Sequence, residues 1–183
     1  MKAIITEYRA LCHQLLVMKP MVKIVSILLA LVIFSQCKKE EPESPFRFSN
    51  FFEKELIQQG FDIDGDSEIS NSEAEAVSSL NISGKKIDNL NGIELFINLD
   101  TLICSSNKLS KLDVSKNKSL VFLDCSYNSL TTLDVSGNMR LTRLHCYNNH
   151  LTKLDVSNHL FLNLLYCYMN RLSSLNIKNT PLK

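Results

Sequence analysis

The sequence predicts a solenoid of stacked coils of about 21 residues, with parallel β-strands, little helix inside the coils and a small helix-loop-helix cap before them. Three observations support this fold class. A 21-residue unit recurs four times from Leu99 onward, its leucine and cysteine positions stay in register, and asparagine recurs at one fixed place in each unit. Because one coil cannot bury its apolar side alone, stacked coils share a continuous core.

Length and composition are those of one ordinary globular domain. The chain has 183 residues, of which 45% are hydrophobic, and a formal net charge of +1 at pH 7. Its 20 lysines and arginines, against 19 aspartates and glutamates, form no sustained basic stripe along the sequence. We therefore expect no electrostatic grip on anionic lipid and no nucleic-acid partner.

The first 37 residues predict an export signal. Residues 24–34 form an uncharged run, apolar except for Ser26, that is far shorter than the roughly 20 residues of a membrane-spanning helix, which indicates a signal-peptide core. The run ends at a sequence, FSQC, that resembles a lipobox, with Gln36 where a small residue is usual. The resemblance implies lipid attachment at Cys37. An ordinary secretory signal cut nearby is the alternative, and both export the protein.

The residues on either side of this signal are also informative. Met18 or Met21 would make a more usual initiator than Met1, so residues 1–37 are interpreted as an upstream extension plus a lipoprotein signal peptide. Residues 38–45, KKEEPESP, form a charged, proline-bearing tether. It is similar to the export signal of surface lipoproteins in Bacteroidetes-type bacteria, although a solvated linker would have the same composition.

Residues 46–86 are expected to form the cap. Within residues 46–60, a helix would place five apolar residues near one face, and Gly60 would end it; these residues are Phe48, Phe51, Phe52, Leu56 and Ile57. The twelve residues 62–73 carry acidic side chains at positions 1, 3, 5 and 12, as an EF-hand loop does. Oxygen ligands for a weakly held Ca²⁺ would come from Asp62, Asp64, Asp66, the Glu68 carbonyl, Ser70 through water and Glu73.

A reading without metal remains open for this loop. Ser67 stands at the sixth position, where the sharp turn normally requires glycine, and there is one such loop rather than a pair. Ser70 and Glu73 have the spacing of a capping box, which needs no metal.

The repeats are expected over residues 87–183. Their recurring positions are Leu99, Leu102, Cys104, Asn107 and Leu109, and the same residue types return 21, 42 and 63 positions later. This pattern resembles the leucine-rich repeat, whose period lies in the 20–29 range. Each unit also contains a half-repeat that closes in sequences such as LDVS, so a coil is expected to have two short extended segments and no helix. A degenerate unit over residues 87–96 is expected to begin the stack.

The polar and sulfur positions of the unit have structural explanations. The asparagines are expected to turn inward and satisfy backbone groups at the bend. The four cysteines are expected to be small core residues, because a column of thiols about 4.8 Å apart does not offer zinc its tetrahedral ligands. Disulfides between adjacent coils are not expected, because side chains on parallel strands point the same way. Three histidines are expected at scattered surface positions: His145, His150 and His159.

The lipobox-like signal, the acidic loop and the LDVS units together resemble Bacteroidetes-type leucine-rich-repeat surface lipoproteins, with an EF-hand-like cap similar in kind to that of internalins. The resemblance implies a lipid-anchored protein at the outer membrane or cell surface, possessing a solenoid that binds a protein or a surface glycan, as an adhesin does. No catalytic motif such as G-x-S-x-G or H-E-x-x-H is present, so we expect no enzyme. A truncated fragment of a longer leucine-rich-repeat protein, whose further domain carries the function, is the alternative.

The binding surface is expected on the concave face, formed by residues that alternate with the inward leucines and cysteines of the first strand. Aromatic residues and arginine, which are enriched at protein interfaces, accumulate there. The expected partner-binding residues are Phe122, Asp124, Arg143, His145, Tyr147, Tyr166 and Tyr168. Alternatively, these aromatic residues pack beneath a further coil.

Overall fold

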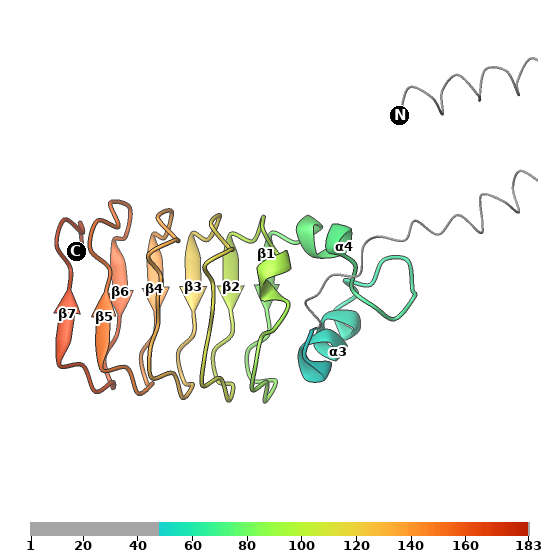
Figure 1. The fold of residues 1–183 in the computed structure, drawn as a ribbon, viewed down its shortest axis with the longest axis horizontal. Helices are drawn as coiled ribbons and strands as arrows, with labels where there is room; N and C mark the ends of the chain where they lie inside the picture. Colours follow the sequence, from blue (N-terminus) through green and yellow to red (C-terminus); the bar gives the residue numbers. More distant parts are fainter. Residues whose placement is uncertain (1–47, 183) are drawn as a thin grey trace, which may run out of the picture. The chain divides into compact units, whose positions relative to one another are not determined.

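The computed structural model describes residues 48–182, all within one compact unit of the chain, Ser44–Lys183. The expected lipidation site at Cys37 and the tether lie outside the described residues. Two helices, α3 (Asn50–Gln58) and α4 (Asn71–Ala76), precede a stack of coils, as Figure 1 shows.

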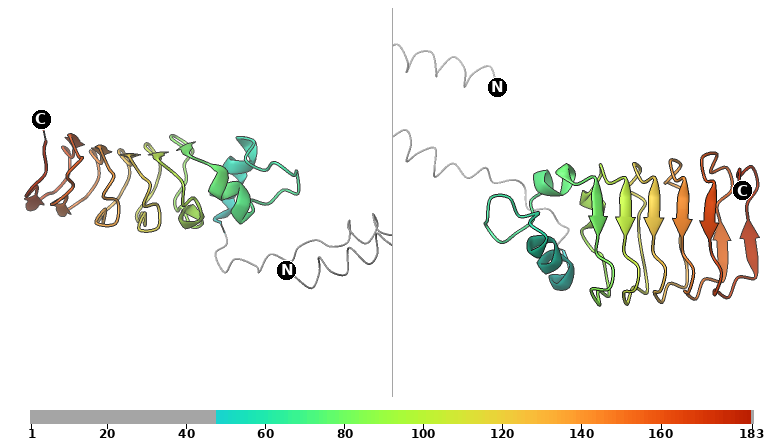
Figure 2. Two further views of the ribbon diagram at one scale, coloured as in Figure 1. Left: turned by 90° about the horizontal axis from the view of Figure 1, so that it is seen from above. Right: turned by 180° about the vertical axis from the view of Figure 1, so that it is seen from behind.

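One strand from each coil contributes to a parallel sheet of five strands, β1-β2-β3-β4-β6. The strands are β1 (Ser79–Asn81), β2 (Thr101–Ile103), β3 (Phe122–Asp124), β4 (Arg143–His145) and β6 (Leu164–Tyr166). Their central leucines are in register, so that Leu102 pairs with Leu123 and Leu123 with Leu144. Both views in Figure 2 show the coils as successive layers along one axis. The predicted solenoid of parallel strands is confirmed.

The second extended segment of each coil forms a smaller sheet. Strands β5 (Lys153–Asp155) and β7 (Ser174–Asn176) pair in parallel, whereas the corresponding segments of earlier coils are extended without regular strand pairing. Within the described coils the only helical element is a single 3-10 turn, η1 (Ile93–Leu95). The coils therefore contain little helix, as the half-repeat predicted.

The stack begins at Ser79, earlier than the expected start at residue 87. Strand β1 pairs with β2 so that Leu80 lies beside Leu102, and the amide of Ile82 donates to the carbonyl of Ile103. Ile82 thus takes the place of the ladder cysteine, and this coil is 22 rather than 21 residues from the next. These two departures hide the first coil from a search for the repeat.

The asparagine of each unit joins its own coil to the preceding one, as expected. In the buried Asn128, Nδ2 donates to the carbonyl oxygens of Cys104 (3.0 Å) and Cys125 (3.1 Å). Its Oδ1 accepts from the amide of Leu109 at 3.0 Å. Asn107, Asn149 and Asn170 make corresponding bonds, so the amides form a continuous ladder.

A second ladder, which the sequence analysis missed, follows the second extended segment. Its members are 21 residues apart and donate to a carbonyl of the preceding coil: Asn117, Asn138, His159 and Thr180. The expectation that His159 lies at the surface is wrong, because its side chain is 1% exposed and Nε2 lies 3.1 Å from the carbonyl oxygen of Val135. His159 replaces the asparagine of the earlier coils, so its role follows from the register.

Helix α3 covers the open end of the first coil. Ser49 caps the helix, and Phe52 and Leu56 are fully buried, which confirms the amphipathic helix. The helix begins at Asn50 rather than at residue 46. Phe51 is 66% exposed because it precedes the buried Phe52 by one residue, about 100° around the helix, and so points away from the core.

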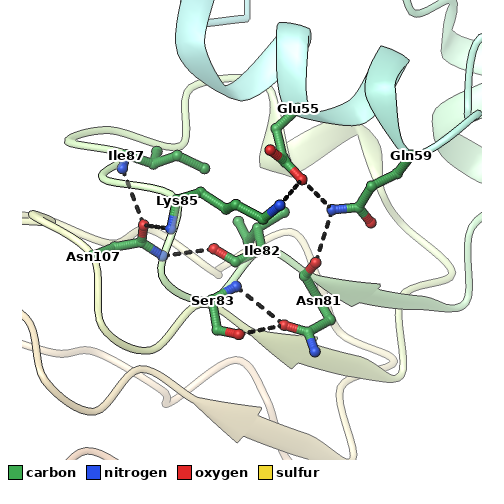
Figure 3. A network of polar contacts seen from close by, with 8 residues as sticks. All are labelled: Glu55, Gln59, Asn81, Ile82, Ser83, Lys85, Ile87 and Asn107. Carbon is green, nitrogen blue, oxygen red and sulfur yellow. Dashed lines mark hydrogen bonds and ion pairs between the residues drawn. The ribbon is translucent and has the colours of Figure 1, made fainter.

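An aromatic cluster and a polar clamp join this cap to the repeats. The rings of Phe48 and Phe96 meet edge to face, with centroids 6.2 Å apart. Figure 3 shows the clamp, in which Glu55 pairs with Lys85 at 2.8 Å while Gln59 donates both to Glu55 and to the backbone of β1.

The carboxyl of Glu55 in this clamp has an altered pKa. Burial raises its pKa, but the hydrogen bonds and charge of Lys85, with the amide of Gln59, outweigh burial and hold the pKa below its ordinary value.

Candidate partner-binding surface

The sheet places the expected binding residues in two columns on its solvent side. Strand register puts Phe122, Arg143 and Leu164 at successive positions of one column. Asp124, His145 and Tyr166 occupy the next, separated from the first by the inward leucines. Alternation along the strand therefore brings the predicted residues of β3, β4 and β6 to one surface, here called the sheet face.

Tyr147 and Tyr168, which follow β4 and β6, extend this surface beyond the strand ends. Their rings stack with centroids 4.6 Å apart and 16° between planes, and the rings of His145 and Tyr166 stack in the same way at 4.7 Å. The Phe122 ring meets His145 edge to face at 5.1 Å. Aromatic contact is thus continuous over three coils, and Tyr166 and Tyr168 are 42% and 55% exposed.

Tyr127 belongs to the same cluster although it was not among the expected site residues. It follows β3, is 48% exposed and packs edge to face on Tyr147 at 5.2 Å. Its backbone has a φ of 52°, close to the 53° of the equivalent turn residues Asn148 and Met169. The repeat register could have identified Tyr127 as a site residue. It lies 21 residues before Asn148, at the position of the unit where the turn is directed outward.

The two charged side chains of the sheet face differ in whether neighbouring residues engage their charged groups. The guanidinium of exposed Arg143 lies 4.5 Å from the centroid of the Phe122 ring, and no carboxylate within residues 48–182 forms an ion pair with it. The carboxylate of Asp124, by contrast, accepts from the amide and hydroxyl of Ser126 at 3.0 and 2.6 Å. Arg143 is therefore the available charge, while Asp124 shapes the turn.

His145 lies between the aromatic rings and is shielded from water. Burial lowers its pKa and the charge of Arg143 lowers it further, whereas Asp124 acts in the opposite direction. Its Nε2 atom is buried without a hydrogen-bond partner. This environment favours a neutral imidazole that serves as a stacking platform.

The cysteine column lies inside the coils. Cys104, Cys125 and Cys146 are fully buried and unbridged, and Cys167 is half-buried near the last coil. Burial raises the pKa of Cys125 well above its ordinary value and that of Cys146 to about 12. Burial in the coils therefore favours the neutral thiol over the thiolate.

The acidic loop of the cap brings its first three aspartates together. Carboxylate oxygens of Asp62, Asp64 and Asp66 lie within 4.8 Å of one another. Glu73 belongs to the capping box, with its side chain accepting from the amide of Ser70 at 2.9 Å, and it also accepts from Ile63 at the start of the loop.

The loop backbone makes the sharp turn despite its serine. Ser67 has a φ of 69°, a left-handed conformation that glycine adopts without strain. The amide of Ser67 donates to Asp62 at 3.0 Å, which helps to hold this conformation. The conformation of this loop is therefore compatible with Ca²⁺ ligands at the aspartates as well as with the capping box.

No helix within residues 48–182 has the length and hydropathy needed to cross a bilayer. A scan against protein-family models found no match, and a search of curated proteins found none that is similar.

Solved structures similar to this chain include two internalin-type proteins of Listeria. The functional domain of InlJ from Listeria monocytogenes, which includes a cysteine ladder, shares 36% sequence identity with a TM-score of 0.55, over 63% of this chain and 28% of the InlJ domain. An internalin, InlF, from L. monocytogenes str. 4b F2365 shares 20% identity with a TM-score of 0.48, over 66% of this chain and 42% of InlF. This chain thus spans less than half the length of either structure. Its coils, parallel sheet and cysteine column identify the described residues as a leucine-rich-repeat solenoid similar to that of InlJ.

Proposed function

We propose that this chain is an exported surface protein that binds a protein partner through its sheet face, and that it acts as an adhesin rather than as an enzyme. The observation that carries the proposal is the continuous set of exposed, mutually stacked rings over three coils. Tyrosine and arginine dominate the energetics of protein interfaces, and rings held by their neighbours lose little conformational entropy on binding.

The chemistry of the same residues favours binding over catalysis. The carboxylate of Asp124 is engaged by Ser126, and Nε2 of His145 is buried between rings. A general base needs an accessible atom within reach of the proton that it removes. Neither side chain offers one in this arrangement, which supports a contact surface.

Replacing Tyr147, Tyr166 and Tyr168 together with serine should reduce partner binding by about 30-fold or more, because a loss of about 2–4 kcal/mol is expected from central aromatic residues. The melting temperature should change little, since these rings pack mainly on one another. Biotinylated full-length protein would be incubated with proteins of the environment, and captured proteins would be identified and their affinities measured by interferometry.

A matched control replaces three exposed residues of another loop, which are also 21 positions apart: Lys118→Ser, Met139→Ser and Leu160→Ser. Capture that is lost in the tyrosine variant and retained in the control supports the sheet face. Equal capture by both variants would show that the partner binds elsewhere.

We further propose that the chain is anchored to the outer membrane by a lipid on Cys37. The short apolar run before this cysteine and its lipobox-like context support the proposal. Intact-mass analysis of detergent-extracted protein should find an acylated form that begins at Cys37, and Cys37→Ser should release the protein into the medium. A soluble wild-type form cut at another residue would contradict lipid anchoring.

We also propose that the acidic loop binds Ca²⁺ weakly and stiffens the cap. The clustered oxygens of Asp62, Asp64 and Asp66 support it, with Glu68, Ser70 and Glu73 completing the set. For a dissociation constant of 10⁻⁴–10⁻³ M, about 5 mM Ca²⁺ should stabilise the fold by about 1–2 kcal/mol. A thermal melt in Ca²⁺ against chelator measures this, with Asp64→Asn as the control that should lose the shift. Identical wild-type melts would leave only the capping box.

A further inference from the structure

One corner of the solenoid collects basic side chains from separate coils. Lys108, Ser129, His150 and Arg171 occupy the same position of consecutive units, and all four are exposed. None of the three basic residues forms an ion pair with another described residue. We call Lys108, His150 and Arg171 the basic corner. The three residues are 42 and 21 positions apart in the sequence, so they form no basic run along the chain. Only the stacking of the coils brings these basic side chains to one corner.

Acidic residues are absent from the same part of the four regular units. The stretches 105–111, 126–132, 147–153 and 168–174 contain no aspartate or glutamate. In the first coil, Asp88 accompanies Lys85 and Lys86. The second extended segments do carry exposed acids, which lie outside these stretches and accept from the backbone two residues on: Asp113, Asp134 and Asp155. The positive charges of the corner are thus separated along each coil from the acidic side chains of the following segment.

The basic corner is continuous with the aromatic part of the sheet face. Tyr127 and Met169 lie two residues before the corner position in their own coils, and they are 48% and 64% exposed. The rings of Tyr147 and Tyr168 stack on each other, which covers one face of each ring. Their phenol groups can donate hydrogen bonds to acceptors on a partner. Arg143, which forms no ion pair with a described residue, adds a positive charge to the same surface.

We propose that the partner contacts this surface with an acidic, extended polypeptide segment whose carboxylates meet Arg143 and the basic corner. The inference rests on the proposed function, because it specifies the partner of the same face. Lys108 and His150 are two coils apart, about 10 Å at the spacing of parallel strands. In an extended chain of the polyproline II type, with three residues per turn and a rise of about 3.1 Å per residue, carboxylates three residues apart lie on the same side and about 9 Å apart. An extended segment that runs across the coils therefore matches the spacing of the corner.

The test uses the full chain and two fluorescein-labelled peptides, one with glutamate at every third residue and one with glutamine instead. Fluorescence anisotropy should show at least tenfold tighter binding of the glutamate peptide, weakening as salt rises from 50 to 300 mM, about a twofold fall in Debye length. The double variant Lys108→Gln, Arg171→Gln should weaken binding about fivefold or more. Lys116→Gln with Lys118→Gln, which removes the same charge from another exposed loop, should leave binding unchanged.

Equal affinity for both peptides, or equal losses in the two double variants, would overturn the acidic preference. Binding of heparin or of phosphatidylglycerol vesicles, without binding of the glutamate peptide, would overturn it in favour of a sulfated glycan or a membrane. The proposed function is tested separately by the tyrosine variant. If capture of the partner depends on the tyrosines but both peptides bind alike, the binding face stands and the acidic partner is excluded.

Discussion

Replacing Asn128 with alanine should lower the free energy of unfolding by about 2–4 kcal/mol, because the change leaves one buried backbone amide without a partner and removes further hydrogen bonds from buried carbonyls. The amide of Leu109 loses its hydrogen bond to Oδ1 of Asn128. The carbonyls of Cys104 and Cys125 each lose one of two bonds, because Asn107 and Asn149 also donate to them. Urea unfolding followed by circular dichroism measures the loss.

The neighbouring residue provides a matched control. The side chain of Ser129 is exposed and its backbone amide donates to the carbonyl of Leu109, a bond that Ser129→Ala retains. This substitution should change stability by no more than about 0.5 kcal/mol. If Asn128→Ala were equally mild, water would be replacing the amide, and the ladder would contribute little to the stability of the stack.

Gly92→Ala should destabilise the protein by about 2–5 kcal/mol and loosen the cap. Gly92 has a φ of 98°, which an L-residue adopts only with strain, and an added Cβ would lie 2.1 Å from a ring atom of Phe48. The ring must therefore move away from Phe52 and Phe96, with which it forms the cluster that joins α3 to the first coil. Thermal melts and limited proteolysis after α3 report both effects.

Two further variants separate the contributions of strain and collision. Gly84 has a φ of 69° but open space around the position of a Cβ, so Gly84→Ala should cost only about 1 kcal/mol from backbone strain. Combining Gly92→Ala with Phe48→Ala should cost less than the sum of the two single changes, because the collision is removed. An additive result would mean that Phe48 and Gly92 are not coupled.

Such cap variants matter for function because a solenoid whose terminal coil is uncovered exposes its core. Leu80 and Ile82 of the first coil are fully buried beneath the cap. A weakened cap should thus fray the stack from β1 towards β4 and disturb the sheet face only afterwards. Stability changes in the cap and binding changes on the sheet face are therefore expected to be separable in the experiments described above.

The repeat period was sufficient to predict the solenoid, the inward leucines and cysteines, and the asparagine ladder. These features depend on residue type at one position of a coil, so repetition at 21 residues makes them visible in one dimension. The outward direction of the tyrosines followed from strand alternation for the same reason. The capping box of Ser70 and Glu73 was also predictable, because it involves residues only three apart.

Other features required the tertiary structure. The first coil departs from the period, so only strand pairing shows that Leu80 belongs to it. The burial of His159, the stacking of Tyr147 on Tyr168 and the gathering of Lys108 with Arg171 join residues from different coils. The sequence by itself determined what each coil buries and exposes. Only the stacked structure decided which exposed side chains become neighbours, because parallel strands bring residues 21 positions apart to within about 4.8 Å.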